Sequence, residues 1–204
     1  DCDLIVEAVP EILAYKQDTF RKVDAVARPD ALIATNTSSL PVMDIAVHSR
    51  RPNRVLGFHF FNPAPVMKLI ELVRTVVTDE AVVEVASGFA ETIGKVPIAV
   101  GDRRGFIANQ LLFPYLNQAI WMVDSGYATK EDVDAAMRAG ANLPMGPVEL
   151  IDLVGVDTLV AVMETIHERV ADPRFAPRPL LRQLMRAGFL GRKSGRGFYT
   201  YEGS

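Results

Sequence analysis

Short apolar runs separated by amphipathic stretches dominate the first half of the chain. Apolar runs bounded by turn residues are typical of strands buried on both faces, and they predict strands at 4–9, 31–35, 54–60, 68–73 and 96–100. Apolar side chains at helical spacing predict helices between them, at 11–28, 41–48 and 78–93. Strands that alternate with helices in this way predict a mostly parallel α/β sheet over residues 1–100.

The second half of the chain has a different pattern. An apolar stripe predicts a long helix over 106–125, and a sequence resembling a capping box, Thr129 to Asp132, predicts the start of another. Three further helices are predicted at 147–154, 156–171 and 179–187, and only 198–201 has strand-like residues. We therefore expect two domains, an α/β domain over 1–100 and an all-α domain over 101–204.

Composition narrows the class of protein. The 204 residues are 49 % apolar and 23 % charged, as in ordinary globular proteins, and no apolar run reaches the ~18 residues of a membrane helix. The net charge of −3, from 22 basic and 25 acidic residues, gives no reason to expect nucleic acid or a membrane as partner. The single cysteine fits a reducing compartment, so we expect a cytoplasmic protein. No Cys/His cluster has zinc-site spacing, so we expect no metal.

A polar cluster, Asn36 to Ser39, follows the predicted strand at 31–35. Ligands of open α/β sheets bind beyond the carboxyl ends of the strands, so these side chains are candidates for a binding site. The alternative is a helix N-cap, for which Ser39 before Leu40 and Pro41 is well placed. Both can hold, because a cap needs only one of the four residues.

His59 and Glu71 are the candidates for proton transfer. His59 stands near a strand end among aromatic residues, and Glu71 interrupts the apolar strand 69–73, where an unpaired carboxylate would cost several kcal/mol. A His–Glu pair would satisfy both groups, and the carboxylate would fix the imidazole tautomer and make the ring a competent general base. The alternatives are a histidine satisfied in the core and a Glu71 that faces solvent on an edge strand.

Other polar residues carry weaker signals. His48 and His167 have charged neighbours and are interpreted as surface residues, and Asn109 in the first turn of the long helix is either a site residue or a surface amide. The sequence has no Gly-x-Gly-x-x-Gly, P-loop, Gly-x-Ser-x-Gly or His-Glu-x-x-His motif. The glycines at 191–197 are spaced wrongly for a dinucleotide fingerprint and predict a mobile tight loop.

Several strings together resemble the 3-hydroxyacyl-CoA dehydrogenase family. They are VEAVPE at 6–11, TNTSSL at 35–40, GFHFFNP at 57–63, VMKLIE at 66–71, GFIAN at 105–109, PMGP at 144–147 and GRGFY at 195–199. Any one string would be a weak signal, but all of them occur in the family's order and with similar spacing over essentially the whole chain.

The resemblance implies reversible oxidation of an L-3-hydroxyacyl-CoA to the 3-ketoacyl-CoA with NAD, in fatty-acid β-oxidation or short-chain acyl-CoA metabolism. His59 corresponds to the catalytic base, Glu71 to its orienting partner, and Ser38 and Asn109 to residues that hold the substrate oxygens. The helical domain corresponds to the family's homodimer contact. The positions that match the NAD site are Glu11, Lys16, Asn36, Ser38, Asn62 and Lys193.

The chain also departs from the family. Its members begin with a strand and a Gly-x-Gly-x-x-Gly turn, and the present sequence starts at Asp1 without them. By resemblance, residues 1–100 are the C-terminal half of a Rossmann-like sheet, and the strand at 4–9 would be a bare edge. If the protein begins at Asp1, we expect calorimetry to detect weak NAD binding or none, and no measurable activity. The alternatives are a domain of a multifunctional fatty-acid oxidation protein and an inactive dimerisation module.

Overall fold

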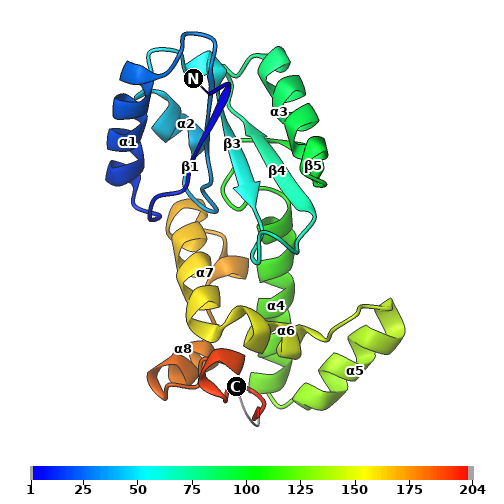
Figure 1. The fold of residues 1–204 in the computed structure, drawn as a ribbon. Helices are drawn as coiled ribbons and strands as arrows, with labels where there is room; N and C mark the ends of the chain where they lie inside the picture. Colours follow the sequence, from blue (N-terminus) through cyan, green and yellow to red (C-terminus); the bar gives the residue numbers. More distant parts are fainter. Residues whose placement is uncertain (1, 202–204) are drawn as a thin grey trace. The chain divides into compact units, whose positions relative to one another are not determined.

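The computed structural model describes residues 2–201 and divides into two units, Asp1–Ile107 and Ala108–Ser204 (Figure 1). The first unit contains one five-stranded sheet, and the second is built from helices. The predicted α/β sheet followed by a helical region is confirmed.

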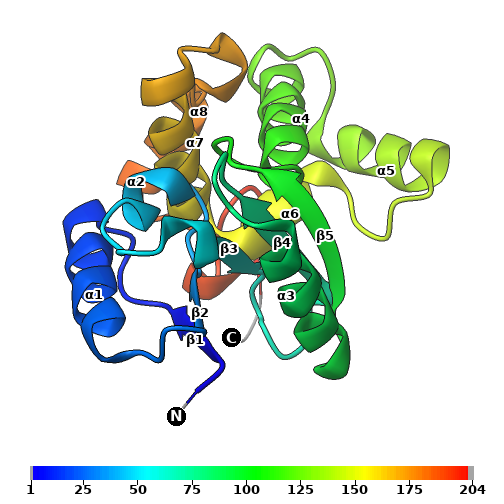
Figure 2. The same cartoon turned by 90° about the horizontal axis from the view of Figure 1, so that it is seen from above.

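The strands lie across the sheet in chain order, which places β1 at one edge, as predicted (Figure 2). Three neighbouring pairs are parallel, and only β3 and β4 are antiparallel. The reason is the short connection at 61–68, because a parallel crossover needs about a dozen residues or more. The strands are β1 (Leu4–Glu7), β2 (Leu32–Thr35), β3 (Val55–Phe60), β4 (Leu69–Arg74) and β5 (Val96–Gly101).

Helices cover both faces of this sheet. Helices α1 (Leu13–Val26) and α2 (Val42–Ala46) lie on one face and α3 (Glu80–Thr92) on the other, and the short 3₁₀ helix η1 (Pro52–Arg54) precedes β3 (Figure 2). Strand β2 is buried along its whole length: Leu32 and Ala34 pack in the core beneath α3, while Ile33 packs beneath α1 and α2. Apolar side chains on both faces explain why this strand reads as a continuous apolar run.

The N-terminus of helix α2 differs from the prediction made from the local sequence. Its N-cap residue is Pro41, without a side-chain cap, so the cap predicted for Ser39 is wrong. The carboxylate of Asp102 instead accepts hydrogen bonds from the N–H groups of Val42 and Met43, at 2.9 and 2.7 Å. A carboxylate at this position satisfies the first amides and complements the positive end of the helix.

The second unit contains α4 (Ala108–Asp124), α5 (Lys130–Ala141), α6 (Pro147–Val154), α7 (Val156–Val170) and α8 (Pro179–Arg186), with 3₁₀ helices η2 (Pro173–Phe175) and η3 (Arg192–Ser194). The predicted cap at Thr129 is confirmed, because its hydroxyl accepts from the N–H of Asp132 at 3.1 Å. The strand-like ending at 198–201 forms only an isolated bridge, between Arg196 and Thr200.

A buried carboxylate, Asp152, holds the glycine-rich segment of the second unit in place. Asp152, 1 % exposed, accepts from the N–H groups of Phe198 and Tyr199 and from the hydroxyl of Tyr201, at 2.9 to 3.0 Å. A Cβ atom at Gly197 would overlap this carboxylate. The tight loop predicted at 191–197 is therefore an ordered segment whose glycine makes room for its anchor.

Another buried carboxylate joins α1 to the segment after α2 in the first unit. Asp24 accepts hydrogen bonds from the hydroxyl of Ser49, the N–H and side chain of Arg50, and the side chain of Arg51, all at 2.9 to 3.0 Å. Burial alone would raise the pKa of Asp24, but these donors outweigh it and lower the pKa from 3.8 to about 2.

This shift predicts a pH-dependent stability. Because the folded-state pKa lies below the unfolded value, the contribution of Asp24 is fully present above 3.8 and is lost as the pH falls toward about 2. We expect Asp24→Asn to lower the free energy of unfolding by about 2 kcal/mol near neutral pH, and the difference from the unmodified protein to vanish near pH 2. Urea titrations across this range measure it. Asp18→Asn, at an exposed position of α1, is the control and should change little; a pH-independent loss for Asp24→Asn would contradict the assignment.

Candidate active site

The centre of the site is a histidine–glutamate pair on two neighbouring strands. His59 of β3 and Glu71 of β4 are directly opposite each other in the antiparallel register, so their side chains share one face of the sheet. Both are buried, and His59 Nδ1 lies 2.9 Å from Glu71 Oε2. The structure therefore brings together the two residues that the sequence paired, and it excludes the alternative of a solvent-facing Glu71.

The surroundings of this pair fix how the imidazole is used. The other carboxylate oxygen of Glu71 accepts from the N–H of Ile107 at 3.0 Å, and the ring of His59 packs against Phe61 and Phe106. Since the carboxylate accepts, Nδ1 carries the hydrogen of the neutral ring, a tautomer inferred from the hydrogen-bond partners. The Nε2 atom is then an acceptor, and it lies 3.0 Å from the Ser38 hydroxyl. This geometry leaves Nε2 as the atom that can take up a proton.

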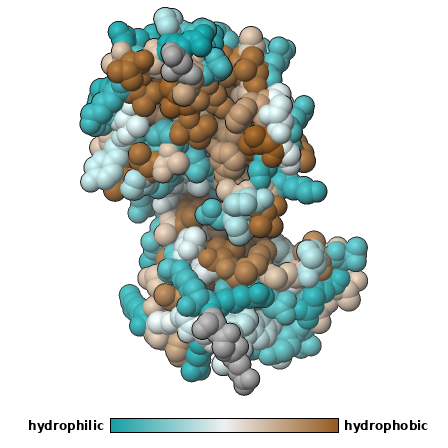
Figure 3. Space-filling model, in the orientation of Figure 1, coloured by the Kyte–Doolittle hydropathy of each residue, from teal (hydrophilic) through white to brown (hydrophobic). Residues whose placement is uncertain are grey.

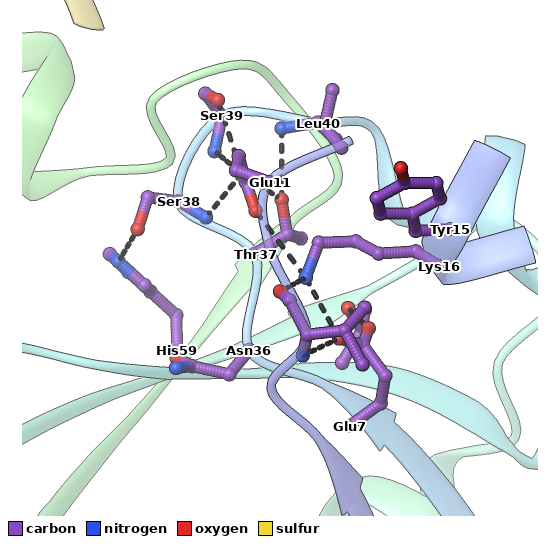
Figure 4. A network of polar contacts seen from close by, with 12 residues as sticks. Glu7, Glu11, Tyr15, Lys16, Asn36, Thr37, Ser38, Ser39, Leu40 and His59 are labelled. Atoms are coloured by element: carbon purple, nitrogen blue, oxygen red, sulfur yellow. Dashed lines mark hydrogen bonds and ion pairs between the residues drawn. The ribbon is translucent and has the colours of Figure 1, made fainter. Parts of the chain in front are cut away.

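The loop that carries Ser38 is organised around Glu11 (Figure 4). Glu11 Oε1 accepts from the hydroxyl of Thr37 at 2.5 Å, from the N–H groups of Ser38 and Ser39 at 3.0 Å, and from the Ser39 hydroxyl at 3.1 Å. Burial works against the charge of this carboxylate, but the Thr37 hydroxyl, the ammonium of Lys16 and the two backbone N–H groups together hold the pKa of Glu11 below its ordinary value. Glu11 is therefore an anion whose position shapes the loop.

Lys16 lies behind Glu11 and is completely buried. Its ammonium is 2.9 Å from Glu7 Oε1, 3.2 Å from the carbonyl oxygen of Val9 and 3.4 Å from Glu11 Oε2 (Figure 4). The sequence placed Lys16 among the cofactor positions. In the structure it joins two carboxylates, and a direct contact with a bound molecule stays a prediction.

Two asparagines predicted at the cofactor have different surroundings. Asn36 Oδ1 accepts from the N–H of Phe60 at 3.0 Å, which ties the loop after β2 to the end of β3. Asn62 is exposed in the connection after β3. The structure therefore places Asn36 in the same loop as Ser38, and Asn62 two residues beyond the end of the strand that carries His59.

The last two predicted residues belong to the second unit. Asn109 lies in the first turn of α4 and is 9 % exposed, which excludes the interpretation as a surface amide. Lys193 is exposed in η3, and its ammonium pairs with Asp157 Oδ2 at 2.7 Å. The roles of Asn109 at the substrate and of Lys193 at the cofactor stay predictions.

Glu7 is a site residue for which sequence reasoning gave no role. Glu7 is a charged residue inside an apolar run, the same signal that singled out Glu71. Its carboxylate accepts from the Thr35 hydroxyl at 2.7 Å and from the Val9 N–H at 2.6 Å, in addition to Lys16. The argument that a buried carboxylate needs a partner would have found it too.

Two features of other protein classes are absent from residues 2–201. In this part of the chain, no group of three or more His, Cys, Asp or Glu side chains could hold a metal ion. None of the helices described is both long and apolar enough to cross a membrane.

Two family models, two curated relatives and a solved structure are similar to this chain. Residues 1–103 match the family model described as 3-hydroxyacyl-CoA dehydrogenase, NAD binding domain, and residues 105–201 match the model of the C-terminal domain of the same family. A 3-hydroxybutyryl-CoA dehydrogenase of Mycobacterium tuberculosis is 52 % identical over 203 residues, which are 98 % of this chain and 71 % of that protein. A probable 3-hydroxybutyryl-CoA dehydrogenase of Bacillus subtilis is 44 % identical over 98 % of this chain and 70 % of its own length. The crystal structure of M. tuberculosis FadB2 superposes with a TM-score of 0.93, at 52 % identity over 98 % of this chain and 71 % of that one.

Proposed function

The chain belongs to the 3-hydroxyacyl-CoA dehydrogenase family, and from this premise we propose that His59 is the general base in an NAD-dependent oxidation of L-3-hydroxyacyl-CoA to 3-ketoacyl-CoA. The observation that carries the role of His59 is the alignment of Glu71, His59 and Ser38, joined at 2.9 and 3.0 Å. A buried carboxylate on one ring nitrogen and a hydroxyl on the other is the arrangement that proton transfer from an alcohol requires.

The proton follows a short path in this proposal. The 3-hydroxyl of the substrate donates to Nε2 of His59, and Ser38 beside it holds the same oxygen. As the proton moves to Nε2, the ring becomes an imidazolium, and the charge of Glu71 stabilises it at 2.9 Å. The packing of Phe61 and Phe106 against the ring keeps it in one orientation throughout.

The residues around Ser38 have the chemistry to hold NAD. Glu11 and Asn36 follow the carboxyl ends of β1 and β2, where parallel sheets bind ligands, and the exposed Asn62 follows β3. Carboxylate, amide and hydroxyl groups hydrogen-bond to the ribose hydroxyls and the carboxamide of a nicotinamide nucleotide. When bound, NAD takes the hydride that leaves C3 of the substrate. In the proposal, the side chains of Glu11, Asn36 and Asn62 hold and orient the NAD.

We assign a four-carbon substrate, because the relatives named above are 3-hydroxybutyryl-CoA dehydrogenases. The test is to give the intact protein NAD and the two enantiomers of 3-hydroxybutyryl-CoA and to record NADH absorbance. We expect NADH from the (S) enantiomer, which is the L form, and at least 100-fold less from the (R) enantiomer or from free 3-hydroxybutyrate. Absence of NADH from every substrate, or equal rates with both enantiomers, would overturn the proposal.

We also propose a homodimer formed through the second unit, in the cytoplasm. Apolar side chains remain on the surface of both units (Figure 3). In the second unit they include Leu111, Trp121 and Tyr127, and the rings of the last two stack with centroids 6.0 Å apart. Exposed aromatic and aliphatic groups are typical of surfaces that associate. Sedimentation equilibrium measures the oligomeric state, and cell fractionation measures the location.

A further inference from the structure

The buried ammonium of Lys16 is the starting point. Its side chain is fully enclosed and that of Glu7 is 1 % exposed, so this ion pair has exchanged water for protein partners (Figure 4). Such a pair is costly to bury unless hydrogen bonds satisfy both groups. Here they do: Glu7 also accepts from the Thr35 hydroxyl and the Val9 N–H, and Lys16 also donates to the Val9 carbonyl. The pair is therefore fixed to β1 and β2.

Glu11 connects the Glu7–Lys16 pair to Ser38. Lys16 lies 3.4 Å from Glu11 Oε2, while Glu11 Oε1 accepts from the N–H groups of Ser38 and Ser39. Those two N–H groups belong to the peptide planes on either side of the Ser38 Cα atom. One carboxylate thus orients both planes and with them the Cα–Cβ bond, so only rotation about that bond is left to bring the hydroxyl to His59 Nε2, 3.0 Å away.

We propose that Glu7 and Lys16 are positioning residues for the proton-transfer step, acting through Glu11 on the orientation of Ser38. This inference rests on the proposed function, in which Ser38 and His59 share the substrate hydroxyl. Neither Glu7 nor Lys16 touches the reacting atoms in it. Glu7 fixes the ammonium of Lys16, this ammonium attracts Glu11, and Glu11 in turn holds the loop that carries Ser38. Displacements of about 1 Å at a reacting group can cost about 100-fold in rate, so a distant pair can matter to turnover.

Three variants of the intact protein separate positioning from stability. Lys16→Met leaves the buried Glu7 without its cation, and Glu7→Gln leaves Lys16 with only the longer contact to Glu11 at 3.4 Å. We expect each change to lower the melting temperature by about 10 °C. The double variant is neutral and of similar volume, and we expect it to recover most of that loss. With saturating NAD, however, the double variant should still have a kcat about 10- to 100-fold below that of the unmodified protein, because Glu11 has lost its ammonium. Recovery of kcat together with stability would overturn the inference, as would a rise in KM for NAD at unchanged kcat.

Combining the Glu7→Gln/Lys16→Met double variant with Ser38→Ala tests whether the pair acts through Ser38. If the pair acts through Ser38, the double variant lowers kcat only while the serine is present, and adding it to Ser38→Ala lowers kcat less than twofold further. A purely structural role predicts that the two losses multiply, which would contradict the inference. Asp24→Asn is the matched control, because Asp24 is a buried carboxylate on the same helix as Lys16 and is paired with Arg51. Its effect on kcat should be less than twofold in either background.

A substitute variant covers the case of misfolding, and the activity of the unmodified protein and of His59→Gln tests the proposed function separately. Should the double variant not fold, Glu11→Gln examines the same route, because the Glu11 side chain is 37 % exposed and its loss of charge is better tolerated. Its effect on kcat should likewise disappear in the Ser38→Ala background, and multiplying losses would contradict the inference. Failure of the proposed function looks different: the unmodified protein then forms no NADH, or His59→Gln turns over normally. An active protein with an inactive His59→Gln and independent losses at Ser38 and Glu7 overturns this inference alone.

Discussion

Replacing His59 with glutamine should lower kcat for NADH formation by about 10³-fold or more, because the amide has the size to fill the site but no nitrogen that takes a proton. The loss falls on kcat, since the ring lies buried between Glu71 and Ser38 and contributes little surface for binding. We expect the dissociation constant for NAD to change less than about threefold. Steady-state kinetics with (S)-3-hydroxybutyryl-CoA and a calorimetric titration with NAD measure the two quantities.

His48→Gln is the control for this experiment. His48 also belongs to the first unit, where its Nδ1 lies 3.0 Å from a guanidinium nitrogen of Arg21, outside the site. Its replacement should leave kcat within about twofold of the unmodified protein. If His59→Gln retained more than a tenth of the turnover, another group would have to accept the proton, and the role given to His59 would be wrong.

Glu71→Gln should lower kcat by about 10²- to 10³-fold, for a reason that the structure makes specific. The N–H of Ile107 donates to Oε1 of Glu71, so the oxygen of a glutamine would remain on that side. The amide nitrogen would then face His59 Nδ1 and donate to it. That donation favours the tautomer with its hydrogen on Nε2, which cannot accept a proton from the substrate. The variant also lacks the charge that stabilises the imidazolium.

Activity and stability together check the Glu71 prediction. The amide is nearly isosteric with the carboxylate, so we expect the urea midpoint to fall only modestly while kcat falls by orders of magnitude. Glu80→Gln, at the exposed start of α3, serves as the control and should alter neither. A Glu71→Gln protein that is as stable as the unmodified one and keeps most of its kcat would show that the carboxylate is only a structural partner of the histidine.

The pairing of His59 with Glu71 was predictable from the sequence for a simple physical reason. A charged residue within an apolar strand is forced to find a partner, and antiparallel neighbours offer only a few positions from which one can come. The strands themselves were predictable because both faces of the sheet are covered, which leaves long apolar runs. The fold class and the central pair were therefore within reach of pattern and burial arguments.

The remaining parts of the site depend on contacts that no local pattern contains. Lys16 stands among polar residues of an amphipathic helix and looks like a solvated side chain, yet it is completely buried against Glu7. The cap of α2 comes from Asp102, which lies 60 residues along the chain from Val42. Ser39 has the residue type of a cap, but its hydroxyl is bound by Glu11. The sequence alone does not show whether Ser39 or Asp102 binds the first amides of α2, because the outcome depends on contacts between distant parts of the folded chain.

The antiparallel register of β3 and β4 has a consequence for how this protein can change in length. His59 and Glu71 face each other because of strand pairing, and residues 63–68, which follow Phe61 and Asn62, serve to join the two strand ends. Insertions or deletions in that connection can therefore accumulate without disturbing the pair. One residue added inside either strand would turn His59 or Glu71 to the opposite face of the sheet, since neighbouring positions alternate. In descendants of this chain we expect changes of length to be tolerated at 63–68 and to be excluded in the strands on either side.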